Sequence, residues 1–455
     1  MANDPVPGLL ARAAAVLEAE FAHLPGLEST LDESAASRIL EATARRLGDN
    51  YPYFHPLYAG QMLKPPHPVA RAAYALAMKI NPNNHARDGG RASSEMEVEA
   101  VKELAALFGW AGEGSYLGHL TSSGTLANLE ALWMAGQLEA GKRIVGSEQA
   151  HYTHRRISAV LRLPYDGVAA DSRGRMSLEA LEAELRKGDV GTVVATLGTT
   201  AIGAVDPLDE ILALRVQYGF RVHVDAAYGG YFGLVAEQLD EPARQAYAAI
   251  SSADSIVIDP HKHGLQPYGC GCVLFRDPAV GRFYKHDSPY TYFTSKELHL
   301  GEISLECSRA GAAAAALWAT QQFLPLKPDG EFARGLARGL RAARELDRRL
   351  REDGRFAALS AGKPELDIAV WAMRGSDARQ AGERAQLVFN ACAKRDLHLA
   401  LVQLPRFWFG GADRDGDRRG AVQCLRSVLM KPEHEEWLDR IWDRLSAAAG
   451  EAVGE

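Results

Sequence analysis

The sequence has few of the features that mark secreted or membrane-bound proteins. Its five cysteines show no framework spacing, and their odd number favours reduced thiols in a cytosolic setting. No uncharged apolar run approaches the length that spans a membrane. The apolar residues 9–16 are interrupted by Arg12, so no secretory signal is evident. We therefore expect a cytoplasmic protein that does not bind a membrane.

An excess of basic residues is also missing. The formal net charge is −7, which argues against a surface for nucleic acid or an anionic membrane. The contents of hydrophobic residues, 47%, and of charged residues, 24%, are ordinary for a globular enzyme. With 455 residues the chain can bury a large core, and more than one domain is expected.

The central part of the chain alternates between two kinds of pattern. Short β-branched runs stand at residues 143–145, 192–197, 221–224, 255–258 and 271–275. Helical patterns lie between some of them or before them, at residues 126–135, 178–187 and 208–218. This alternation predicts an α/β fold with a mostly parallel sheet covered on both faces. Ligands of such a sheet bind at the carboxyl ends of its strands.

The two ends of the chain carry helical patterns of their own. Two short amphipathic helices are expected between residues 9 and 47, and they are too small to fold alone. We expect them to pack on another surface, such as a partner subunit.

Further helices are expected elsewhere in the chain. Ser94-x-x-Glu97 fits a capping box and predicts a helix that starts there. A long helix is expected after residue 328, with Phe332, Leu336, Leu340 and Ala343 on one stripe.

The resulting division has three parts. We expect residues 1–55 to form an N-terminal helical segment, residues 56–325 a large domain that contains the parallel sheet and its ligand site, and residues 326–455 a smaller C-terminal α+β domain.

Two charged residues that follow apolar runs point to the chemistry. Lys262 lies in a sharp break after residues 255–258, and Asp225 ends another run 262 − 225 = 37 residues earlier. An amine that must form an imine, and an acid that must stay ionised beside a heterocyclic nitrogen, would be placed in this way. We predict pyridoxal 5′-phosphate as the cofactor, with Lys262 as the Schiff-base lysine and Asp225 as the partner of the ring nitrogen.

Simpler interpretations of these residues exist. Lys262 would otherwise be a solvated surface lysine, and Asp225 would cap a strand-to-turn junction. The histidines on either side of the lysine, His261 and His263, resemble a metal pair, but no third ligand of suitable spacing accompanies them. No metal is predicted.

Ser123, Gly124 and Thr125 open a predicted helix and form a phosphate cradle in principle. Backbone N–H groups, hydroxyls and the helix dipole all favour an anion at such a place. Serine and threonine are also common N-caps, so the motif gains its meaning from Lys262.

Three further residues have a predicted role beside the cofactor ring. The His151 imidazole can stack on a pyridine ring and touch the substrate carboxylate. Ala227 is small enough for the ring to lie against it, and Thr200 offers a hydroxyl to the phenolate region. The alternatives are a structural histidine for His151 and a plain turn threonine for Thr200.

Together these motifs resemble the group II pyridoxal-phosphate-dependent amino-acid decarboxylases, which include aromatic amino-acid, glutamate, histidine and archaeal tyrosine/aspartate decarboxylases. The resemblance covers roughly residues 50–430, and its matching stretches are 121–129, 148–157, 193–200, 223–230 and 259–275. It implies fold type I, with an aspartate-aminotransferase-like large domain. It also implies an obligate homodimer with active sites at the interface. The implied reaction converts an L-amino acid to its amine and carbon dioxide through an aldimine on Lys262.

The resemblance assigns further residues to the site. His261 would contact the cofactor, and His223 would be a neighbour of the cofactor or the substrate. Arg426, in the small domain, would bind the substrate carboxylate. A loop tyrosine would protonate the substrate carbon, and Tyr290 is preferred over Tyr292 for this role, with His151 as the other candidate donor.

Some residues depart from the family pattern. Gln61-Met62 stands where aromatic amino-acid decarboxylases have an aromatic pair, so Gln61 is a candidate contact for an acidic or other polar substrate. Leu126 replaces a glutamate of the archaeal members. Arg309, in Cys307-Ser-Arg309-Ala-Gly311, could meet phosphate or a substrate acid, or could form an interface salt bridge instead. The identity of the amino acid stays open.

Other functions are compatible with the same residues. One rival is oxidative decarboxylation with deamination to an aldehyde. Another is a carbon–carbon lyase that acts on a phosphorylated amino alcohol. A third is a catalytically silent protein that binds the cofactor.

Overall fold

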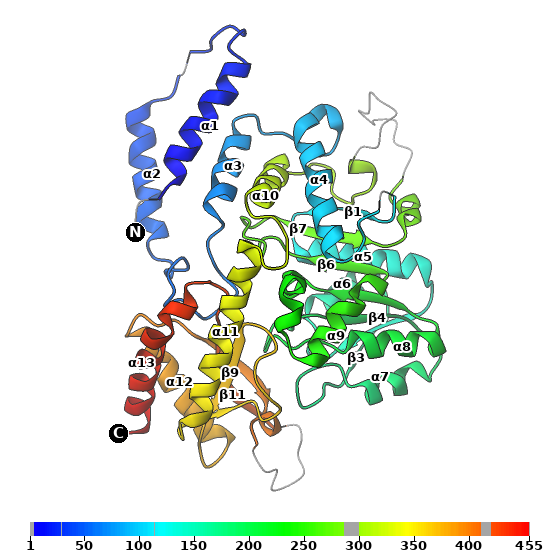
Figure 1. Cartoon of the computed structure of the whole chain (residues 1–455), viewed down its shortest axis with the longest axis vertical. Helices are drawn as coiled ribbons and strands as arrows, with labels where there is room; N and C mark the ends of the chain where they lie inside the picture. Colours follow the sequence, from blue (N-terminus) through cyan, green and yellow to red (C-terminus); the bar gives the residue numbers. More distant parts are fainter. Residues whose placement is uncertain (1–3, 29, 113, 286–299, 411–419, 455) are drawn as a thin grey trace.

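A seven-stranded sheet forms the centre of the chain (Figure 1). The computed structural model describes residues 4–454 apart from residues 29, 113, 286–299 and 411–419. The strands are β1 (Leu117–Thr121), β2 (Arg143–Ser147), β3 (Tyr165–Val168), β4 (Val190–Thr196), β5 (Arg221–Asp225), β6 (Ser255–Ile258) and β7 (Gly271–Phe275). Their spatial order is β1-β7-β6-β5-β4-β2-β3. The pairs from β3 through β2, β4 and β5 to β6 are parallel, and only β7 runs antiparallel to its neighbours. The predicted mostly parallel sheet is confirmed.

Helices cover both faces of this sheet (Figure 1). They are α4 (Arg91–Leu107), α5 (Gly124–Leu138), α6 (Thr153–Leu161), α7 (Leu178–Leu185), α8 (Leu208–Tyr218) and α9 (Glu241–Ala249). Helices α3 (Pro68–Met78) and α10 (Gly311–Phe323) pack on each other, and α10 also packs on α4. Alternate residues of a strand serve opposite faces. In β6, Ile256 and Ile258 pack in the largest hydrophobic cluster, whereas Val257 packs with Ala127 and Ala131 of α5.

The start of α4 differs from the sequence-based expectation. This helix begins at Arg91 after Gly90, so the prediction that Ser94 caps it is wrong. Glu97 is only 2% exposed and faces the protein interior. Its carboxylate therefore does not reach back to the helix start but accepts hydrogen bonds from more distant parts of the chain.

A second, smaller sheet lies towards the C-terminus. Its strands are β8 (Phe356–Ala358), β9 (Ile368–Met373), β10 (Ala400–Pro405) and β11 (Ala421–Val428), in the antiparallel order β10-β11-β9-β8. The helices beside it are α11 (Glu331–Glu352), α12 (Ala378–Ala393) and α13 (His434–Val453). The predicted stripe of α11 is buried, and the helix contacts both the second sheet and the segment Gly230–Gln238 of the first domain. The chain also enters this region early, because Ala59 N donates to His398 O and Val428 N donates to Ala59 O.

The N-terminal helices α1 (Val6–Glu20) and α2 (Glu33–Leu47) lie at the edge of the molecule, where α1 contacts α3 (Figure 1). Neither has a buried residue. Val16, Ile39 and Leu40 are 66–67% exposed. Among the residues that the structure describes, none of the helices combines the length and the apolar character needed to cross a bilayer.

Candidate active site

A cavity of about 200 Å³ opens at the carboxyl ends of the central strands. Its lining residues are Ser123, Gly124, Thr125, Asn128, His151, Thr153, Thr196, Gly198, Thr200, Asp225, Ala227, Tyr228, Asp259, His261 and Lys262. Every residue predicted to bind the cofactor is among them. The strand order explains this, because the adjacent parallel strands β4, β5 and β6 all end at this edge of the sheet.

Lys262 stands in a tight turn that follows β6. Its Nζ lies 3.0 Å from Asp259 Oδ2. Burial disfavours the ammonium ion, but the nearby charges of Asp259 and Asp225 outweigh burial and raise the pKa of Lys262. Asp259 Oδ1 is buried and has no hydrogen-bond partner among the described residues. The amine is thus held at the cavity by a carboxylate that can still accept another donor.

The start of α5 approaches this lysine turn closely. A Cβ atom at position 124 would collide with the Asp259 carboxylate, so glycine is required there. Ser123 caps the helix through its side chain, which accepts a hydrogen bond from Leu126 N at 3.2 Å. The amides of Gly124 and Thr125, which precede Leu126, have no carbonyl partner within the helix, so they can bind an anion. Glu306 Oε2 accepts a hydrogen bond from Ser122 N at 2.9 Å beside this cradle.

Asp225 ends β5 and is almost fully buried. Its Oδ2 lies 2.8 Å from His154 Nε2, and its Oδ1 accepts a hydrogen bond from Ala227 N at 3.1 Å. Burial alone would raise the pKa of Asp225, but the hydrogen bond with His154 and the charge of Lys262 hold that pKa below its ordinary value. The carboxylate is therefore ionised at neutral pH.

The other predicted contacts surround the same space. His151 Nδ1 accepts a hydrogen bond from Thr153 N at 3.3 Å, and burial lowers the pKa of His151, so its imidazole is neutral at pH 7. His261 Nδ1 lies 2.7 Å from the carbonyl oxygen of Cys270. Thr200 lines the cavity from the turn after β4.

The residues predicted to bind substrate do not line this cavity. His223 is buried in β5 behind it, where its ring nitrogens lie 2.8 Å from Ser255 Oγ and from Asn128 Oδ1. Arg426, in β11, donates from Nη1 to Gln61 Oε1 at 3.0 Å. Its Nε and Nη2 atoms are buried and have no partner among the described residues. Tyr290 and Tyr292 lie outside the described residues.

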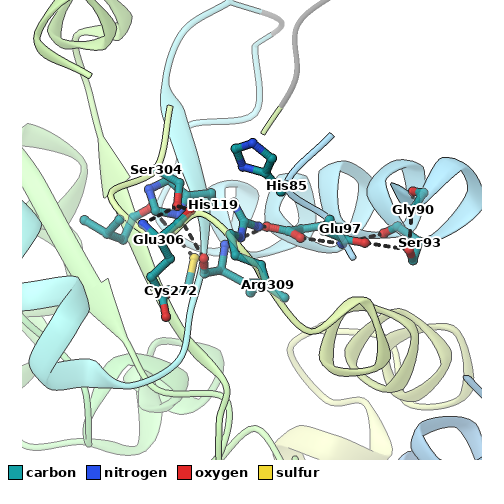
Figure 2. Close-up of polar contacts among 12 residues, drawn as sticks. His85, Gly90, Ser93, Glu97, His119, Cys272, Ser304, Glu306 and Arg309 are labelled. Carbon is teal, nitrogen blue, oxygen red and sulfur yellow. Dashed lines mark hydrogen bonds and ion pairs between the residues drawn. The ribbon is translucent and has the colours of Figure 1, made fainter. Parts of the chain in front are cut away.

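Arg309 lies in a separate buried cluster (Figure 2). Its Nη2 pairs with Glu97 Oε1, which also accepts a hydrogen bond from Leu120 N at 3.0 Å. Glu97 Oε2 accepts a hydrogen bond from Asn84 Nδ2 at 2.7 Å. Burial lowers the pKa of Arg309 to about 10, so the guanidinium keeps its charge at pH 7. The role of Arg309 in binding substrate or phosphate stays a prediction.

Some residues of the site were missed at the level of sequence. Asp259 and His154 contact the predicted lysine and aspartate, and Asn128 and Tyr228 line the cavity. His154 follows His151 by three residues, which is the spacing of neighbours on a helix. That spacing is the one signal that could have singled it out.

Comparison with known proteins adds a family match. A model described as the pyridoxal-dependent decarboxylase conserved domain matches residues 51–372. An L-tyrosine decarboxylase of Enterococcus faecium is 29% identical over 375 residues, which cover 60% of this chain and 60% of that protein. An L-2,4-diaminobutyrate decarboxylase of Rhizobium meliloti is 38% identical over 227 residues, which cover 47% of this chain and 44% of that protein. The matched part thus spans less than two thirds of either relative.

The solved structures show the same fold. The crystal structure of mouse CSAD in apo form superposes with a TM-score of 0.78 and 21% sequence identity, over 98% of this chain and 97% of the mouse chain. This likeness, together with the mostly parallel sheet, confirms the α/β architecture of fold type I.

Proposed function

The chain belongs to the family of pyridoxal-dependent decarboxylases, and from that premise we propose that it converts an L-amino acid to the corresponding amine and carbon dioxide. One observation carries the proposal. Asp225, which ends β5, and Lys262, which follows the adjacent parallel strand β6, line one cavity together with the helix start at Ser123–Thr125. An amine, an ionised carboxylate and an anion cradle in one cavity are what pyridoxal phosphate requires.

The described residues fit this cofactor. The Lys262 amine would hold the aldehyde carbon covalently, and Asp225 would face the ring nitrogen. The glycine at position 124 leaves the cradle open, and the unpartnered Asp259 Oδ1 offers an acceptor beside the lysine. Ser123, Gly124 and Thr125 would hold the phosphate.

The ring of the cofactor would lie between two side chains. His151 would stack on one face of the ring, and Ala227 would lie against the other. Thr200 and His261 would contact the cofactor edge, since both line the cavity.

When bound, the cofactor supplies a protonated ring that takes up the electron pair left on the α-carbon as the carboxylate departs as carbon dioxide. Asp225 keeps its negative charge and so holds the proton on the ring nitrogen. A proton must then reach the α-carbon, and the hydroxyl of Tyr290, or His151 once its imidazole has taken up a proton, would deliver it.

Arg426 and Gln61 are proposed to bind the substrate. The two unpartnered nitrogen atoms of Arg426 form a buried cationic donor set that suits a carboxylate. Burial lowers the pKa of Arg426, and nearby Tyr228, which lines the cavity, partly offsets this effect, so the arginine lies near the cofactor site. His223 would act from behind, through Asn128.

We further propose a homodimer in the cytoplasm. The apolar side chains that α1 and α2 expose would pack on a second copy of the chain, which would complete active sites at the interface. All five cysteines are free, which suits a reducing compartment.

Carbon dioxide release tests the activity. The protein with added pyridoxal phosphate is incubated with each of the twenty amino acids, with ornithine-like amino acids and with sulfinic acids. Release of carbon dioxide with an equal amount of amine is the expected result. An aldehyde with ammonia would identify an oxidative enzyme instead, and bound cofactor without turnover of any substrate would identify a silent protein.

A further inference from the structure

The segment from His151 to His154 touches three parts of the proposed cofactor site. His151 lines the cavity, and Thr153 Oγ1 donates to Thr125 Oγ1 of the phosphate cradle at 3.4 Å. His154, one residue further on, lies 2.8 Å from Asp225 Oδ2 through its Nε2 atom. The residues at the start of α6 thus connect the proposed phosphate cradle with the Asp225 carboxylate.

The contact between His154 and Asp225 is buried on both sides. The His154 side chain is 0% exposed and that of Asp225 is 6% exposed. In the described part of the chain, His154 is the one side chain that forms a hydrogen bond with Asp225. A hydrogen bond to a charged group in a dry environment is stronger than one between neutral groups.

We propose that His154 is a positioning residue that fixes the Asp225 carboxylate, in its ionised form, against the ring nitrogen of the cofactor. The inference rests on the proposed function, since it requires pyridoxal phosphate in the cavity. His154 itself does not line the cavity, so it acts through Asp225 and not on the substrate.

The surroundings of His154 favour this role over a simple packing role. Its Nδ1 atom is buried and has no partner among the described residues, so the contact with Asp225 is its sole hydrogen bond there. Burying an imidazole with one unpartnered nitrogen costs free energy, which an apolar residue at the same place would avoid. The other buried histidine nearby, His223, makes two hydrogen bonds and lies edge-on to His154 at a centroid distance of 6.2 Å.

The test compares two cofactors that differ at the ring nitrogen. Dissociation constants are measured by absorbance titration of the cofactor-free protein with pyridoxal phosphate and with 1-deazapyridoxal phosphate, whose ring nitrogen is replaced by a C–H group. His154→Leu should weaken the binding of pyridoxal phosphate about 10- to 100-fold, which is the range for loss of a hydrogen bond to a charged group. The same substitution should leave the affinity for the deaza analogue unchanged, because that analogue has no ring nitrogen for Asp225 to hold.

Matched variants control for the fold of α6. His154→Gln, whose amide can donate to Asp225 from nearly the same place as Nε2, should restore most of the affinity. His154→Phe keeps the ring volume and replaces His154→Leu as the test variant if the leucine variant folds poorly. It should show the same selective loss of affinity for pyridoxal phosphate. Ser158→Ala removes a buried hydroxyl without a described partner from the next turn of α6 and should bind both cofactors as the unmodified protein does.

Two results would overturn the inference: an equal loss of affinity for both cofactors, or no loss for either. Failure of the unmodified protein to bind pyridoxal phosphate is a different result, and it would contradict the proposed function itself.

Discussion

The cavity and the cluster around Glu97 are both built from buried charged side chains, but their charges are satisfied differently. In the cluster, both oxygens of Glu97 accept hydrogen bonds from within the protein, from Leu120, Arg309 and Asn84. Figure 2 shows Glu97 beside Arg309. At the cavity, Asp259 keeps an oxygen without a described partner beside Lys262. Arg309 Nη1 is also buried without a described partner, so the difference separates the two carboxylates, Glu97 and Asp259, and not the two sites as a whole.

The Glu97 cluster joins elements that are distant in the sequence. Glu97 is in α4, Leu120 is in β1, and Arg309 precedes α10. Residue Glu306, a few positions before Arg309, contacts Ser122 next to the proposed phosphate cradle. We therefore interpret the cluster as a frame that holds the cradle in place.

Replacement of Lys262 should have the largest effect. Lys262→Ala removes the amine that would hold the cofactor, so we expect activity to fall on the order of a thousandfold or more, as it does when other covalent groups are removed. The absorbance of the bound cofactor near the visible edge should disappear as well. Lys187, an exposed lysine that pairs with Glu184, provides the control, and Lys187→Ala should leave activity unchanged. Retained colour with retained turnover in Lys262→Ala would refute the assignment.

The sequence revealed the cavity because its main residues follow apolar strands directly. The runs at residues 255–258 and 271–275 match β6 and β7 end for end, and the polar residues after β5 and β6 meet as the parallel order requires. Local patterns suffice for this, since the carboxyl ends of neighbouring parallel strands share one edge.

The Glu97 cluster could not be predicted in the same way. Arg309 is 212 residues away from Glu97 in the sequence. The local pattern at Ser94-x-x-Glu97 favours a capping box, but burial of Glu97 and its long-range partners override that preference. Likewise, the contact of His154 with Asp225 joins residues that are 71 positions apart. Such pairings follow from the tertiary structure and leave no local signal.

Breaking the Glu97–Arg309 pair should reduce the stability of the fold more than the catalytic activity. Glu97→Gln leaves a buried guanidinium without a counterion, and Arg309→Met leaves a buried carboxylate. Removal of one partner of a buried ion pair costs about 3–5 kcal/mol, so each variant should unfold at a lower urea concentration in the absence of cofactor. The double variant should lose less than the sum of both, because neither charge is then left alone.

An exposed pair gives the matched control for this prediction. Arg379 and Glu383 form an ion pair on the surface of α12, with side chains that are 75% and 58% exposed. Arg379→Met should change the free energy of unfolding by less than about 1 kcal/mol. If Arg309→Met keeps its stability but binds cofactor or substrate more weakly, then Arg309 is a ligand-binding residue and the cluster belongs to the active site.

Asp367 provides the test with the smallest expected effect on the comparison of buried carboxyl groups. It is a buried carboxyl group whose hydrogen-bond partner is a neutral phenol. The group is 1% exposed, and Tyr228 OH donates to its Oδ1 at 2.5 Å. Burial, only partly offset by this hydrogen bond and by Lys64, raises the pKa of Asp367 from 3.8 to about 6. Between these two pH values the folded state binds more protons than the unfolded state, so this group makes the free energy of unfolding fall as pH rises from about 4 to 6.

Asp367→Asn keeps the acceptor for Tyr228 but does not titrate. Relative to the unmodified protein, it should therefore gain roughly 1–3 kcal/mol of stability between pH 4 and pH 7. Urea unfolding at pH 4 and at pH 7 measures this difference, and a difference that is independent of pH, or of the opposite sign, would show that Asp367 is ionised in the folded protein.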